Sequence, residues 1–219
     1  MISWDSYRVG VDIYAEQLPI ALIRYHIREA ARDFCQKTLI LRETLTAQSI
    51  IQGVRDYTLT ASTDTAIVKA IEVEVQETNN EDRQRIEPFP EEALDRDKAG
   101  WRVQGTTDRY FYQRVPEVLS LSWTPEATFT NGLFVVVALK PSAAATQGHD
   151  YLYNHWHEAI EAGALARILS VPGQPWTNLN MAAGFAAAYG ASVSMATVDA
   201  VGSHTNKPTF RQRFVGYGI

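Results

Sequence analysis

Apolar residues recur every three or four positions between residues 17 and 37, and this spacing predicts the first helix of the chain. The recurring positions are Ile20, Ile23, Ile27 and Phe34. We expect these four side chains to form one buried stripe in the core of a helical bundle. The arginines between them fall off the stripe, so they can face solvent or a neighbouring molecule.

The pattern changes between residues 39 and 141, where apolar and polar residues alternate in short runs separated by Gly, Pro, Asn and Asp. Residues 71–75 and 119–123 each place apolar side chains at every second position, which predicts two half-buried strands. Residues 133–139 are apolar on both faces and are predicted to form the central strand. Weaker patterns predict short strands at 101–104 and 109–114, an exposed polar loop at 77–85 and a helical turn within 88–98. Together these segments predict an antiparallel β-sandwich or a barrel-like sheet.

Helical spacing returns after Pro141, with one predicted helix at residues 150–170 and another at 178–200. Two prolines and a glycine in residues 171–176 separate these helices. All three helices can form one bundle, so the β region becomes an insertion into a helical unit that is discontinuous in sequence. The predicted class is therefore α+β. The predicted units are residues 1–38 (N-terminal segment and first helix), 39–141 (inserted β domain), 142–201 (second and third bundle helices) and 202–219 (extended C-terminal arm).

The two later helices are rich in alanine and glycine, whose small side chains let helices approach closely, either within a subunit or between copies. The helix predicted at residues 150–170 also contains larger apolar residues. We expect Trp156, Ile160 and Leu165 to complete the bundle core that the first helix begins.

The C-terminal segment mixes aromatic residues with arginines and has no helical period. Its distinctive side chains are Phe210, Arg211, Arg213, Phe214 and Tyr217. Aromatic residues and arginine are enriched where protein interfaces gain most of their binding energy. We therefore predict that the segment is an extended arm that binds a partner.

Composition and charge narrow the classes of function. The 219 residues carry a formal net charge of −5, which argues against tight binding of nucleic acid but allows DNA to slide past. The sequence shows no uninterrupted apolar segment of about 18 residues, so no membrane contact is expected. The N-terminus lacks the pattern of a secretory signal. Cys35 is the single cysteine, which excludes an intramolecular disulfide and predicts a buried apolar role.

His149, His155, His157 and Glu158 form the one constellation that suggests metal chemistry. Helical ligands should be three or four residues apart to share a face, whereas His155 and His157 are two apart and point about 200° away from each other. A zincin motif would require histidine at position 161, which is Glu161. The sequence also lacks the G-x-S-x-G and Walker motifs. We therefore predict no catalytic residue, no metal site and no cofactor.

Two blocks of the sequence resemble the tailed-phage head-to-tail adaptor (connector) proteins, the tail tubular protein A and portal-adaptor family. The block LPIALIRYHIREAARDFCQKT at residues 18–38 is similar to that family's opening helix, with its Leu-Pro start and Ala-Ala-x-x-Phe-Cys-x-x-Thr ending. The block EAIEAGALARILSVPGQPW at residues 158–176 is similar to the family's Ala-Ile-x-x-Gly-Ala-Leu-x-Arg-Leu-Leu helix and Pro-Trp turn. The strand-rich middle also falls in the family's order. The C-terminal arm and the polar 77–85 segment depart from the family pattern.

The resemblance implies a structural protein of the virion neck, assembled in the host cytoplasm, and not an enzyme. Such a protein forms a homo-oligomeric ring, implied to be a dodecamer, under the portal protein. Its helical end packs on the portal, its β end meets a downstream tail or nozzle protein, and genomic DNA passes through its lumen without sequence-specific binding.

Two other functions stay open at this point. A tail-completion or baseplate protein would share the α+β composition but bind the tail tube, so the identity of the partner separates it from an adaptor. A metal-dependent hydrolase would use the three histidines, and metal analysis would detect it. The sequence also leaves open whether the arm binds the portal or a ring neighbour.

Overall fold

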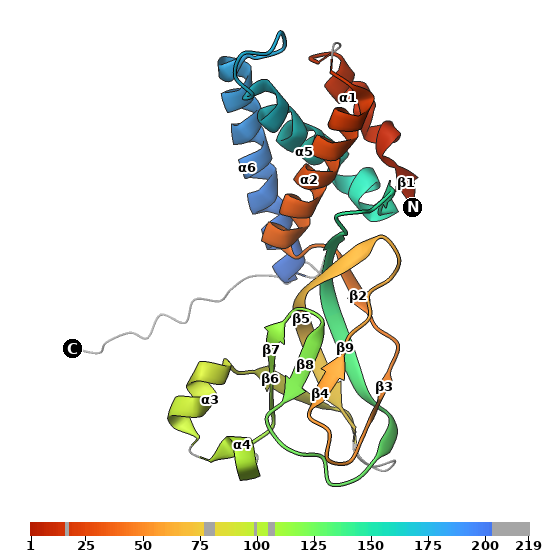
Figure 1. Cartoon of the computed structure of the whole chain (residues 1–219), viewed down its shortest axis with the longest axis vertical. Coiled ribbons are helices and arrows are strands. Elements are labelled where there is room, and N and C mark those ends of the chain that lie inside the picture. Colours follow the sequence, from red (N-terminus) through yellow and green to blue (C-terminus); the bar gives the residue numbers. More distant parts are fainter. Residues whose placement is uncertain (16–17, 77–81, 99, 105–107, 203–219) are drawn as a thin grey trace, which may run out of the picture.

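The long helices gather at one end of the molecule and the large sheet at the other (Figure 1). The computed structural model describes residues 1–15, 18–76, 82–98, 100–104 and 108–202. The strands of the β end lie between the second and fifth helices in sequence, so the helical end is built from two separate stretches of chain. The predicted α+β class is confirmed.

The helical end contains four α-helices and short N-terminal elements. These are β1 (Ile2–Ser3), the 3-10 helix η1 (Trp4–Tyr7), α1 (Arg8–Asp12), α2 (Ile20–Thr38), β10 (Gln147–Gly148), α5 (Asp150–Leu169) and α6 (Leu179–Gly202). β1 pairs with β10, and α5 contacts α1, α2 and α6. The helix α5 is therefore the central element of this end.

The helix α2 starts later than predicted and buries most of the predicted stripe. Pro19 has extended backbone angles and caps the helix, because its ring fixes φ and it has no N–H group to donate. Ile23, Ile27 and Phe34 are each 1% exposed or less. Ile20 is 48% exposed, so its assignment to the bundle core is wrong. Ile20 is the first residue of α2. The elements that cover the rest of the apolar stripe do not reach this end of the helix.

The helix α5 supplies the centre of the helical core. Ile160 and Leu165 are buried, while Trp156 is half-buried and its ring lies 5.4 Å from that of Phe34. Trp156 also interrupts the helical backbone, with φ −136° and ψ 15°, so α5 bends at this residue. Gly163 marks the closest approach of the helices, because a Cβ there would lie 2.9 Å from the Tyr189 ring.

The β end is one curled, half-barrel sheet of eight strands among the described residues. Its strands are β2 (Arg42–Thr44), β3 (Gln48–Ile50), β4 (Asp56–Thr58), β5 (Thr65–Val75), β6 (Gln84–Pro88), β7 (Tyr110–Val115), β8 (Val118–Leu121) and β9 (Phe129–Pro141). Their order is β2-β9-β5-β6-β7-β8-β4, and β3 also pairs with β9. β9 covers the predicted central strand and has neighbours on both sides. Two register shifts in its pairing with β5 favour the curl.

One strand pair departs from the predicted antiparallel arrangement, because β6 and β7 run parallel. A parallel pair needs a crossover connection, and here it contains α3 (Glu91–Asp97) and α4 (Trp101–Gln104). The predicted helical turn within residues 88–98 corresponds to α3. The predicted strand at 101–104 is wrong, because four residues are too few to distinguish a strand from a helical turn.

Ser120 and Ser122 are also not on a solvated strand face. Both are 2% exposed or less, Ser120 within β8 and Ser122 directly after it. The Ser120 hydroxyl donates to Asp56 Oδ1 at 2.6 Å, and the Ser122 hydroxyl accepts from the Tyr110 amide at 3.0 Å. Hydrogen bonds of this kind allow polar side chains to be buried.

Candidate interaction surfaces

The inner side of α6 attaches this helix to α2 and α5. Ala182, Ala196 and Ala200 are buried along it, and Tyr189 lies between them. The Tyr189 hydroxyl donates to Asp33 Oδ2 at 2.7 Å. Burial tends to raise the pKa of Asp33, but hydrogen bonds from Lys37 and Tyr189 outweigh it and lower that pKa below its usual range. Asp33 therefore stays ionised and fixes the position of α6 against α2.

The opposite side of α6 is exposed and apolar, and we call it the outer face. Its residues are Ala183, Gly184, Ala187, Ala191, Ser194, Met195, Val198 and Val201. Met195, Val198 and Val201 are between 64% and 81% exposed. Asp199, beside this face, is the single charged residue in the sequence of α6. A helix that is apolar on all sides normally lies within a core, an interface or a membrane, so the outer face is a candidate contact surface.

Among the described residues, α6 is the one helix long and apolar enough to cross a membrane. The core helix of a soluble protein can meet the same criterion, but little of this helix is buried here. The small residues of α5 differ, because Ala159, Ala162 and Gly163 are buried between helices of the same subunit. The expectation of close helix packing within the subunit therefore applies to α5, while much of α6 faces outward.

The crossover helices α3 and α4 form a small lobe that stands away from the sheet (Figure 1). Its own apolar cluster consists of Leu94, Trp101 and Tyr112, with the Trp101 and Tyr112 rings edge to face at 5.5 Å. The Trp101 indole donates to Asp95 Oδ1 at 2.9 Å. This cluster is separate from the main core and joins the lobe to β7 through Tyr112, which the pattern of residues 101–104 did not indicate.

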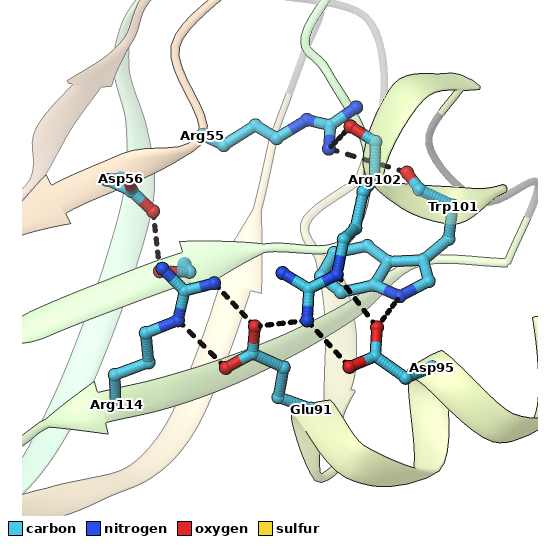
Figure 2. A network of polar contacts seen from close by, with 8 residues as sticks. Arg55, Asp56, Glu91, Asp95, Trp101, Arg102 and Arg114 are labelled. Atoms are coloured by element: carbon cyan, nitrogen blue, oxygen red, sulfur yellow. Dashed lines mark hydrogen bonds and ion pairs between the residues drawn. The ribbon is translucent and has the colours of Figure 1, made fainter.

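Ion pairs attach this lobe to the sheet, as Figure 2 shows. The Arg114 guanidinium of β7 donates to both carboxylate oxygens of Glu91. The Arg102 guanidinium of α4 donates to both oxygens of Asp95, at 2.8 and 2.6 Å, and lies 2.9 Å from Glu91 Oε1. Because Glu91 is shared by two arginines, the network connects α3, α4 and β7.

A further arginine, Arg55, directly precedes β4 and bonds to α4 (Figure 2). Arg55 donates to the Arg102 carbonyl oxygen at 3.0 Å and to Thr124 Oγ1 at 2.7 Å. The hydrogen bonds from Arg114 to Glu91 and from Arg102 to Asp95 are the main causes that lower the pKa values of these two carboxyls. The network therefore holds the lobe in one position at neutral pH.

Replacement of Glu91 by glutamine should loosen the lobe with little change in the melting temperature, because both of its arginine partners are about half exposed and ion pairs with exposed groups contribute little stability. The measurement is amide hydrogen exchange, which we expect to accelerate in α3 and α4. Glu92→Gln is the matched control, since Glu92 is exposed and has no ion-pair partner within the described ranges. Equal exchange in the two variants would contradict a role for the network.

The same loosening should occur in the unchanged protein in acid. The pKa values of Glu91 and Asp95 are lowered from ordinary values of 4.5 and 3.8. Their ion pairs therefore contribute full stability above those values, and the contribution disappears as the pH falls through the lowered pKa values. Protection of the α3 and α4 amides, measured against the intrinsic exchange rate at each pH, should fall only at such acidic pH.

The three histidines considered for a metal site occupy structural positions, and Glu158 is exposed. His149 caps α5 by accepting a hydrogen bond from the Tyr151 amide at 3.2 Å. His155 lies against the Tyr151 ring, and His157 Nδ1 is 2.9 Å from the Tyr153 carbonyl oxygen. Within the described part of the chain, no group of three or more His, Cys, Asp or Glu residues could hold a metal ion.

The predicted arm residues lie outside the described residues, as do residues 77–81 of the predicted polar loop. These residues are Phe210, Arg211, Arg213, Phe214 and Tyr217. The surfaces that the structure brings forward are instead the outer face and the α3–α4 lobe. For the outer face, the sequence did offer a signal, which is the apolar α6 segment with a single charged residue. For the α3–α4 lobe, no pattern in the sequence indicated which charged residues pair.

The family model of the SU10 adaptor protein matches residues 8–209, from α1 to beyond α6. The chain belongs to the SU10 adaptor family. No curated protein matches the chain. The family is one of phage head-to-tail adaptors, so the predicted resemblance is confirmed. The adaptor is a structural component of the phage particle at the head-to-tail junction, where it contacts portal and tail proteins.

Proposed function

We propose that the adaptor forms a ring beneath the portal, connects the capsid to the tail and surrounds the exit path of the DNA. The proposed ring contains twelve copies. Its helical end contacts the portal, and its β end, including the α3–α4 lobe, contacts the next tail or nozzle protein. The proposed role is structural, without catalysis, and assembly takes place in the host cytoplasm.

The observation that supports self-assembly is the outer face of α6. A folded subunit that worked alone would leave Met195, Val198 and Val201 in water on a helix with one charged residue. Monomeric soluble proteins rarely expose a continuous apolar surface of this extent. Assembly with other copies would cover it.

The proposed contact with the portal includes the C-terminal arm. Phe210, Arg211, Arg213, Phe214 and Tyr217 have the side chains expected of an anchor that enters a groove of a partner. The net charge of −5 supports a channel wall that lets DNA pass without gripping its phosphates.

Electron microscopy of the purified adaptor, with and without its cognate portal, tests the proposal. We expect ring-shaped density at the tail-facing end of the portal, with the helical end of each adaptor toward the portal. The same sample without portal shows whether the ring forms alone. Absence of the adaptor from the portal, with binding to tail tube instead, would reject the proposal in favour of a tail-completion or baseplate protein.

A further inference from the structure

The half of α6 that begins at Leu179 presents small side chains on its outer face, and the half that ends at Gly202 presents large ones. Ala183, Gly184 and Ala187 are exposed in the first half. Such small side chains allow another element with larger side chains to approach the helix closely. The outer face of a 24-residue helix is about 36 Å long and roughly 10 Å wide. That area is roughly half of what one partner contributes to a standard interface, so other elements must add to the contact.

A second exposed apolar surface lies on α1, and we call it the α1 face. Val9 and Ile13 are 73% and 68% exposed, and they are four residues apart, so they lie on one side of the helical turn. In Figure 1, α1 and α6 lie on either side of α2 and α5, which both of them contact, and α1 is level with the first half of α6, where the Tyr14 ring after α1 reaches Phe185. The element that carries the large exposed residues is thus level with the half of α6 that carries the small ones.

We propose that the first half of the outer face of α6 packs against the α1 face of the next copy. This inference rests on the proposed ring and names its contact surfaces. A contact between two different surfaces is head-to-tail: it leaves one surface of each kind free for the next subunit, and it gives a ring where the rotation between copies closes. Pairing of α6 with α6 would instead close at two copies.

Other occupants of the outer face fit the structure less well. The face contains no Lys or Arg, so it has no group to contact DNA phosphates. A membrane would have to receive a helix whose Tyr189 is bonded to Asp33 and whose Ala200 carbonyl accepts a hydrogen bond from Arg42 at 2.7 Å. These contacts attach α6 to the folded body along its length, so a second copy is the better occupant.

A double-mutant cycle on portal-bound rings tests the contact. Ala183→Glu with Ala187→Glu should reduce the ring yield at least about tenfold, because unpaired carboxylates would be buried against apolar side chains. Val9→Lys with Ile13→Lys should reduce it similarly. All four substitutions together should restore much of the yield, because lysine and glutamate then face each other across the contact. Recovery of the ring yield in the fourfold variant is the result specific to contact between α6 and the α1 face. If the two pairs of substitutions acted at unrelated places, the fourfold variant would form even fewer rings than either double variant.

Ala127→Glu is the matched control, because Ala127 is an exposed residue of the β end and the substitution is the same. Melting temperatures of the variants confirm that each subunit is folded. Normal rings from both double variants, or loss without rescue, would overturn the contact while the proposed function stands. A wild-type protein that never attaches to portal would overturn both. Flotation of wild-type protein with phosphatidylcholine vesicles, abolished by the α6 substitutions, would assign the face to lipid and overturn the contact.

Discussion

Deletion of residues 207–219 is expected to abolish attachment of the adaptor to its portal while the described helices and strands keep their fold. The deleted segment contains all five proposed anchor residues of the arm. Side chains of these types dominate the binding energy of interfaces. Their joint removal should therefore cost more binding energy than the remaining contacts with the portal can supply. The buried core of the described residues is formed by residues before Gly202, so we expect the truncated chain to fold.

The measurement is co-sedimentation of the truncated adaptor with assembled portal, beside a melting curve of the free protein. A variant with Phe210→Ala and Arg213→Ala in the full-length chain is the matched comparison, because it keeps the length of the segment. Attachment of the truncated adaptor at the full-length level would reject the arm as the portal anchor. Attachment without ring closure would assign the arm to a ring neighbour.

Substitution of Gly163 by valine should lower the free energy of unfolding by about 1–3 kcal/mol. The first carbon added at this position would lie 2.9 Å from the Tyr189 ring and 3.3 Å from Ala30 Cβ. The ring cannot turn away freely, because its hydroxyl is bonded to Asp33. Separating α5 from α2 and α6 would instead leave gaps along the whole bundle.

Calorimetry of the free adaptor should show a decrease in melting temperature of about 2–10 °C for a protein of this size. Gly190→Val is the matched control, since Gly190 is an exposed residue of α6 with no described atom within 4 Å of an added Cβ. Equal melting temperatures for the two variants would contradict tight packing at Gly163.

Elements with a long and regular hydrophobic pattern were predictable from the sequence. The periodicity of residues 17–37 locates α2, and the apolar run at 133–139 locates the interior of β9. Segments decided by contacts with distant residues were not predictable. Trp101 is helical because Leu94, Asp95 and Tyr112 receive its side chain, and Ser120 is buried because Asp56 accepts its hydrogen bond.

The candidate surfaces show the same limit. The composition of α6 indicated close packing, but it could not tell which side of the helix meets α5 and which side stays exposed. That distinction depends on Tyr189, which orients the helix through Asp33, a residue 156 positions earlier in the chain. Ile20 was misplaced for a similar reason, because periodicity assigns a side to a residue but does not show where the covering elements end.

The insertion of the sheet between α2 and α5 has a consequence for the order of folding during synthesis. Strand pairs of the β end can form as soon as residue 141 has left the ribosome, whereas the stripe of α2 has to wait for α5 and α6. Contacts between such distant segments form slowly, because the intervening chain must first be ordered. A nascent adaptor therefore exposes Ile23, Ile27 and Phe34 until its last helix is made. Chaperones that bind apolar segments would be expected to recognise α2 during this interval.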